Sequence, residues 1–145
     1  MPAHRRTFLC LLLTTAAIGA GDGRRVAPAN AATREVVVWR SVGRWSGRGN
    51  TQTESFTSDT GSLRVRWQTN HEVRPGDGTF RLTLHSAISG RPLAQAVDHR
   101  GVGADTSYVS EDPHVFYVVV DSARVEWSFT IDEGIRARAI GASDR

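Results

Sequence analysis

Histidines are the first side chains in this sequence that could hold a metal ion. His71-Glu72 begins like the zinc-binding motif H-E-x-x-H, but Pro75 stands where the second histidine is required. His85, His99 and His114 are the remaining candidates, and no short ligand spacing connects them. A metal site would therefore have to be assembled by folding, and we expect these three histidines to be solvated or singly hydrogen-bonded instead.

Carboxylates in predicted turns offer a second cation site. Asp77, Asp105 or Asp112 could hold Ca²⁺ together with loop carbonyl groups, because calcium prefers oxygen ligands. No other feature of the sequence supports this site. We therefore predict no cofactor, with Ca²⁺ as the alternative.

The sequence lacks the usual motifs of nucleophilic catalysis. The sequence contains no G-x-S-x-G motif, and no base is predicted beside Ser46, Ser86 or Ser107. All 18 basic residues are arginine, and the one cysteine, Cys10, lies in the predicted leader, so the mature chain offers no Schiff-base amine and no thiolate. A non-catalytic protein is favoured. The alternative is a secreted hydrolase with its site on loops that meet at one end of the fold, namely those of Trp45, His71, Asp105 and His114.

Aromatic residues beside arginines give the best indication of a binding site. Trp39, Trp45 and Tyr108 have no clear place in the predicted core, and Trp45 and Arg48 lie in a glycine-rich loop. An exposed tryptophan near arginine can form a shallow platform for sugars or peptides. Trp45 alternatively folds back as a lid, which is favoured because the end of a sandwich needs an apolar plug.

A basic strip is the second candidate binding surface. Arg64 and Arg66 point away from the apolar face of their strand, and Arg81 and His85 do the same on the following strand. If the two strands are neighbours, these side chains form one strip, which Glu126 could neutralise. The strip would bind an anionic envelope polymer, or it is an ordinary solvated face with paired charges.

The strand that organises the chain is Ser62–Asn70, in which Leu63, Val65, Trp67 and Thr69 alternate with polar residues. A period of two places an apolar row on one face, which needs a second sheet to cover it. Further strands are predicted at residues 35–42, 51–57, 79–88, 105–109, 114–121 and 124–132. A two-residue turn at Ser89-Gly90 is expected to pair the strand at 79–88 with the residues after it, so that Leu82 lies opposite Val97 and Arg81 opposite Asp98, a register that points Gln95 inward. Seven to eight short strands separated by turns, without a disulfide, predict an all-β antiparallel sandwich, either jelly-roll-like or immunoglobulin-like. Its core should contain Trp67, Phe80, Trp127 and Phe129.

Residues 1–31 are predicted to be an export signal. Arg5-Arg6 precede a short apolar run that is too short to span a membrane, and they resemble a twin-arginine signal, with a general secretory signal as the alternative. Cleavage is expected after Ala31, or else after Ala20. The folded domain should then cover residues 32–134 and end in a flexible tail at 135–145.

The net positive charge of this sequence comes from the leader. Arg5, Arg6, Arg24 and Arg25 leave with it, so the mature domain is close to neutral although the whole chain has a formal charge of +3. This balance argues against nucleic-acid binding. No membrane span is expected in the mature chain.

The mature chain resembles small exported bacterial β-sandwich domains of an uncharacterised family. The motifs that carry the resemblance are Arg44-Trp45-Ser46-Gly47-Arg48-Gly49-Asn50, Thr53, Phe56, residues 63–67, Gly78-Thr79-Phe80, Gly101, Gly103, Thr106-Ser107-Tyr108, Phe116-Tyr117, Asp121-Ser122-Ala123 and Trp127. The resemblance implies a fold and a periplasmic or extracellular location, but no reaction. We therefore expect a non-catalytic binding or interaction module at the cell envelope, whose partner is an envelope glycan or a protein.

Overall fold

Alternation of apolar and polar side chains divides the chain into strands separated by turns. The computed structural model describes residues 33–141, which contain nine β-strands and no helix. The strands are β1 (Thr33–Arg48), β2 (Thr51–Gln52), β3 (Phe56–Ser58), β4 (Ser62–Asn70), β5 (Thr79–Ser86), β6 (Pro92–Arg100), β7 (Gly103–Ser110), β8 (His114–Ala123) and β9 (Glu126–Ile140). Within this part of the chain, therefore, no helix could cross a membrane. The predicted leader lies outside the described residues.

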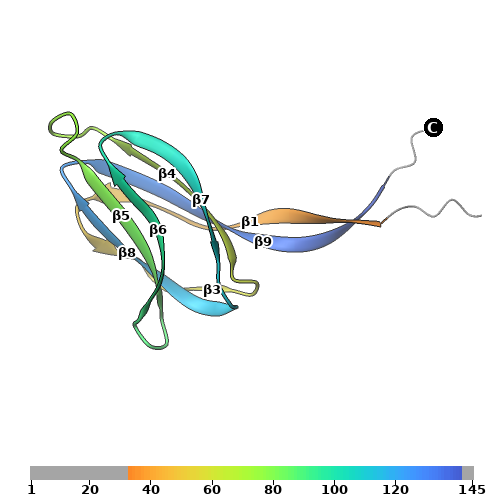
Figure 1. Ribbon diagram of the computed structural model, residues 1–145. Helices are drawn as coiled ribbons and strands as arrows, with labels where there is room; N and C mark the ends of the chain where they lie inside the picture. Colours follow the sequence, from red (N-terminus) through yellow and green to blue (C-terminus); the bar gives the residue numbers. More distant parts are fainter. Residues whose placement is uncertain (1–32, 142–145) are drawn as a thin grey trace, which may run out of the picture. The chain divides into compact units, whose positions relative to one another are not determined.

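Two antiparallel sheets pack face to face, which confirms the predicted sandwich (Figure 1). One sheet has the order β1-β9-β4-β7 and the other β2-β8-β5-β6, with β3 also paired to β8. The chain crosses between the sheets at nearly every connection after β3, and only β5 and β6 form a hairpin within one sheet. This alternation is that of a jelly roll and not of an immunoglobulin sandwich.

The core lies between the two sheets and is built as the periodicity predicts. Leu63 and Val65 on β4 are fully buried, and Trp67 is 9 % exposed. Phe80 on β5 and Phe129 on β9 pack in the same cluster. Because strand side chains alternate between faces, Arg64 and Arg66 must lie on the outer face of their sheet.

The β5–β6 hairpin keeps the predicted register only near its open end. Arg81 pairs with Asp98 and Leu82 with Val97, as expected. Register shifts after Leu82 and after Leu84 then change the pairing. An unshifted ladder would have turned Gln95 toward the core, whereas the observed strand leaves it exposed.

The first and last strands are longer than the sequence predicts. Residues 43–48, expected as a loop, continue β1 after a register shift between Ser41 and Gly43. Residues 135–140, expected to belong to a flexible tail, continue β9 and pair with residues 33–38. The prediction was wrong at both places because pairing with a distant strand, not local sequence, keeps these residues extended.

The paired ends of β1 and β9 form a two-stranded arm, defined here as residues 33–38 and 135–140. β4, the other neighbour of β9, reaches only as far as Glu133, so the arm has no third strand. Val37 and Val38 in the arm are 55 % and 51 % exposed. Figure 1 shows the two strands continuing together beyond the sheets.

Candidate functional site

The predicted basic strip is divided between two surfaces. β4 and β5 belong to different sheets, so Arg64 and Arg66 face one side of the sandwich while Arg81 and His85 face the other. Arg81 donates to Asp98 at 3.3 Å, and His85 lies against Tyr117 with ring centroids 5.2 Å apart. The two strands are not neighbours, so the condition for one continuous strip is not met. The part formed by β4 instead joins arginines on β1.

The outer face of the β1-β9-β4-β7 sheet gathers most of the charged and aromatic groups that the sequence singled out. Its register places outward-facing residues of four strands side by side. We call this surface the arginine face, and its main members are Trp39, Arg44, Arg48, Arg64, Arg66, Gln68, Tyr108, Glu126, Thr130 and Asp132. It carries four arginines and two carboxylates and therefore has an excess of positive charge.

Asp132 is the central anion of this face. The Asp132 carboxylate accepts hydrogen bonds from Arg64 Nε and Nη2 at 3.1 and 2.9 Å, and from Arg66 Nε at 3.1 Å. Asp132 is 3 % exposed, whereas the side chains of Arg64 and Arg66 are 23 % and 52 % exposed. One carboxylate thus fixes two guanidinium groups but neutralises only one charge.

Trp39 and Tyr108 form an aromatic edge beside these arginines. The Arg64 guanidinium carbon lies 4.5 Å from the centre of the Trp39 ring, which is a cation–π contact. The Trp39 and Tyr108 rings are 5.9 Å apart, and Tyr108 is 69 % exposed. Residues from three different strands therefore present ring faces and a cation on one surface.

Two shallow hollows lie along the same face. The first, of about 430 Å³, is lined by residues that include Arg44, Arg66 and Thr130. Arg44 Nε donates to Thr130 Oγ1 at 3.3 Å, and within residues 33–141 no carboxylate oxygen lies within 4.0 Å of its guanidinium group. The second hollow, of about 440 Å³, is lined in part by Arg48 and Glu126. Arg44 is therefore the cation best placed to meet an external anion.

Trp45 is the one predicted ligand-binding residue that faces away from the arginine face. It stacks on Phe129 with centroids 5.2 Å apart, and its Nε1 donates to Glu54 at 3.2 Å. A Cβ at Gly43 would lie 2.5 Å from the Trp45 ring, so only glycine leaves room for this conformation. Trp45 is the lid of the core, and Trp39, which is also half-buried, is the tryptophan that lies on the arginine face.

The three candidate metal-binding histidines do not meet. His85 Nδ1 lies 3.1 Å from the Gly90 carbonyl oxygen, and His114 Nε2 lies 2.6 Å from Ser86 Oγ. His99 packs on Trp67 at 4.8 Å, and its Nε2 is buried without a hydrogen-bond partner in the structure. Across residues 33–141, no three His, Cys, Asp or Glu side chains are grouped closely enough to hold a metal ion.

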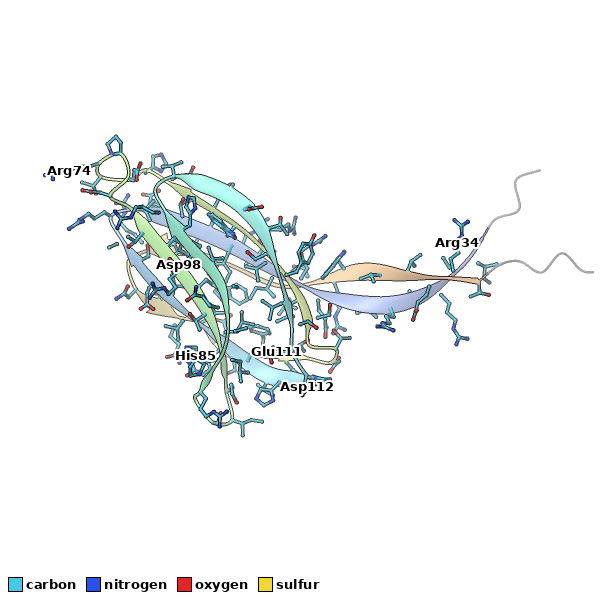
Figure 2. All side chains as sticks on the ribbon, in the orientation of Figure 1. Arg34, Arg74, His85, Asp98, Glu111 and Asp112 are labelled. Carbon is cyan, nitrogen blue, oxygen red and sulfur yellow. The ribbon has the colours of Figure 1, made fainter. Side chains whose placement is uncertain are left out.

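Of the four residues named for a loop-borne hydrolase, His71 and His114 lie at opposite ends of the sandwich, whereas Trp45 and Asp105 lie within β1 and β7 and not on loops. His71 follows β4, where its Nδ1 is 2.7 Å from Glu126, whereas His114 begins β8 beside the β5–β6 turn. Figure 2 labels Arg74, in the same loop as His71, at one end and His85 and Asp112 toward the other. Asp77 and Asp112, two of the calcium candidates, are separated in the same way. The residues of the predicted hydrolase site therefore do not meet at one end of the sandwich.

Ser86 does have a base beside it, contrary to the sequence-based expectation. Its hydroxyl group lies 2.6 Å from His114 Nε2, yet the residue is only 2 % exposed. Ser86 Oγ also accepts hydrogen bonds from the amides of Ile88 and Ser89 at 3.2 and 3.1 Å. The hydroxyl group is already used to close a turn, so this pair is structural.

Glu133 is a buried carboxylate on the inner side of the sheet, at the base of the arm. It is fully buried, and burial by itself raises its pKa. Hydrogen bonds from Ser58 Oγ, the Thr60 amide and Arg40 outweigh burial and lower the pKa of Glu133 to about 2. The carboxylate is therefore ionised wherever the protein is folded near neutral pH.

Arg44 and Asp132 are the charged members of this face that sequence reasoning missed, and Trp39 was noted only as an aromatic residue outside the predicted core. Trp39 alternates with Val38, so its strand face was readable, but its neighbours Arg64 and Tyr108 come from strands that are adjacent only in the folded sheet. Arg44 lay in a segment expected to be a loop.

Comparison with protein-family models, with curated proteins and with solved structures finds no match.

Proposed function

We propose that the protein is an exported, non-catalytic module that binds an anionic polysaccharide of the cell envelope on its arginine face. The observation that carries the proposal is the grouping of four arginines with Trp39 and Tyr108 on the arginine face, whose main members include two carboxylates, Glu126 and Asp132. Export is supported by the leader sequence, with its Arg5-Arg6 pair before a short apolar run.

The side chains of this face suit a charged sugar. Guanidinium groups bind carboxylate, sulfate or phosphate through paired hydrogen bonds, and aromatic ring faces pack against the apolar faces of sugar rings. Asp132 holds Arg64 and Arg66 in place before any ligand arrives, which reduces the entropy lost on binding. The hollows are open and shallow, so an extended polymer fits this surface better than a small molecule.

The arginines of the two outer faces allow a matched test. Arg66 on the arginine face and Arg81 on the opposite face each pair with one aspartate, and both side chains are 52 % exposed. Binding of polygalacturonate would be measured by titration calorimetry for the wild type, Arg66→Ala, Arg44→Ala and Arg81→Ala. We expect the first two variants to bind roughly tenfold more weakly and Arg81→Ala to bind like the wild type.

Two comparison ligands make the experiment decisive. Neutral dextran should not bind, because the proposal depends on charge, and added salt should weaken polygalacturonate binding by screening. The proposal fails if polygalacturonate does not bind or if Arg81→Ala is as damaging as Arg66→Ala. Tighter binding of a single-stranded oligonucleotide would replace the polysaccharide with nucleic acid as the ligand.

A further inference from the structure

The arm carries an apolar face that nothing within residues 33–141 covers. Alternation continues from the core, where Glu133 and Arg40 pair on the inner side of the sheet, so every second residue of the arm lies on that same side. We call this surface the core-side face of the arm, and its apolar members are Val36, Val38, Ile135, Ala137 and Ala139. The opposite sheet does not extend beneath them.

An uncovered face of this kind is unfavourable for an isolated chain. Val36 and Val38 are 38 % and 51 % exposed, although β-branched residues stabilise a sheet mainly when they pack against a second layer. A two-stranded ribbon is at best marginally stable in water. The core-side face would therefore be stabilised by a second apolar layer that packs against it.

The charges at the two ends of this face indicate what that layer is. Arg34 lies on the core-side face near the far end of the arm, opposite Ala139 (Figure 2). At the base, Arg40 pairs with both Glu133 and Asp59, and the Asp59 side chain is 74 % exposed. The base group therefore has two negative charges and one positive charge, while the tip has one positive charge.

We propose that the core-side face of the arm is a dimerisation surface, covered by the same face of the arm of a second copy. The two arms run antiparallel about a two-fold axis near their middle, so the contact is isologous and closes. Each arm supplies the second layer that the other lacks, as two sheets do in a sandwich. Arg34 of each copy then faces Asp59 of the other, which makes each base group neutral.

Neighbouring valines of the arm provide a matched pair of variants. Val38 points to the core-side face and Val37 to the other face, and their exposures of 51 % and 55 % are nearly equal. Sedimentation equilibrium of the whole chain would compare the wild type with Val38→Asp and Val37→Asp. We expect a dimeric wild type, a dissociation constant raised at least about tenfold in Val38→Asp, and little change in Val37→Asp.

Charge reversal tests the two-fold arrangement independently of the valines. Arg34→Asp and Asp59→Arg should each weaken the dimer, and the double variant should restore it, because the pair is re-formed with opposite signs. Circular dichroism checks that each variant is folded. A monomeric wild type at sub-millimolar concentration, equal effects of Val37→Asp and Val38→Asp, or no restoration in the double variant overturns the proposal. A monomer would leave another segment or protein as the cover of the arm.

Discussion

Arg40 and Glu133 pair across β1 and β9 at the base of the arm, where an arginine side chain that is 53 % exposed donates to a carboxylate that is fully buried. Glu133 also accepts from Ser58 Oγ at 2.8 Å and from the Thr60 amide at 2.9 Å. Its carboxylate thus ties β1 and the β3–β4 turn to β9. This group holds the base of the arm in position.

Glu133→Gln should destabilise the fold by about 2–4 kcal/mol, because hydrogen bonds to a buried charge are lost and a buried amide NH₂ gains no acceptor. Urea unfolding of the wild type and variant measures the difference. Glu126→Gln is the control, since Glu126 pairs with Arg48 at the surface, where both side chains are about half exposed. An equal loss of stability in both variants would contradict the role assigned to Glu133.

Stability should fall in acid because of the same carboxylate. The pKa of Glu133 is about 2 in the folded protein against an ordinary value of 4.5, so the unfolded chain binds the proton more tightly. The contribution of Glu133 is complete above pH 4.5 and is lost as the pH falls toward 2. Unfolding free energies measured across this range should decrease more steeply for the wild type than for Glu133→Gln. Parallel curves would exclude this linkage.

Substitutions at Gly61 and Gly76 distinguish two costs of adding a side chain, namely an unfavourable backbone conformation and a steric clash. Both have positive φ, at 69° and 81°, but a Cβ at Gly61 would lie 1.8 Å from the Glu111 carbonyl oxygen while one at Gly76 meets nothing within 4 Å. Gly76→Ala should therefore cost about 1 kcal/mol from its conformation alone. Gly61→Ala should cost roughly 3 kcal/mol or more, because the β7–β8 turn must move. Thermal unfolding compares them, and equal melting temperatures would contradict the clash.

Local periodicity was sufficient to predict the sandwich and most of its core. Leu63, Val65 and Trp67 are buried as their alternation requires, since a period of two fixes which side chains share a face. The ends of β1 and β9 were missed because residues 135–140 have no pattern of their own and are extended only through pairing with residues 33–38. That partner lies about a hundred residues away, where local sequence carries no information about it.

Four members of the arginine face were predictable from the sequence, but their arrangement on one surface was not. Arg48, Arg64, Arg66 and Tyr108 were all named from sequence, and all lie on one surface. The sequence allowed Trp45 to be either an exposed platform or a lid of the core. The register shift between Ser41 and Gly43 makes it the lid. Without this shift Trp45 would share the outward face of Trp39, because both are odd-numbered residues of one strand.

Ser86 and His114 give a prediction that distinguishes a turn from a catalytic pair. Ser86→Ala removes an acceptor for the Ile88 and Ser89 amides and a partner for His114 Nε2, all in a buried turn. We expect the free energy of unfolding, measured in urea, to fall by about 1–3 kcal/mol. Ser89→Ala is the control, because Ser89 is exposed and its Oγ accepts only a 3.4 Å contact from the Arg91 amide.

Labelling tests whether Ser86 is a nucleophile. A reactive Ser86 would be labelled by a fluorophosphonate probe at a rate that depends on His114. Because the hydroxyl is 2 % exposed and already satisfied, we expect no labelling of the folded protein.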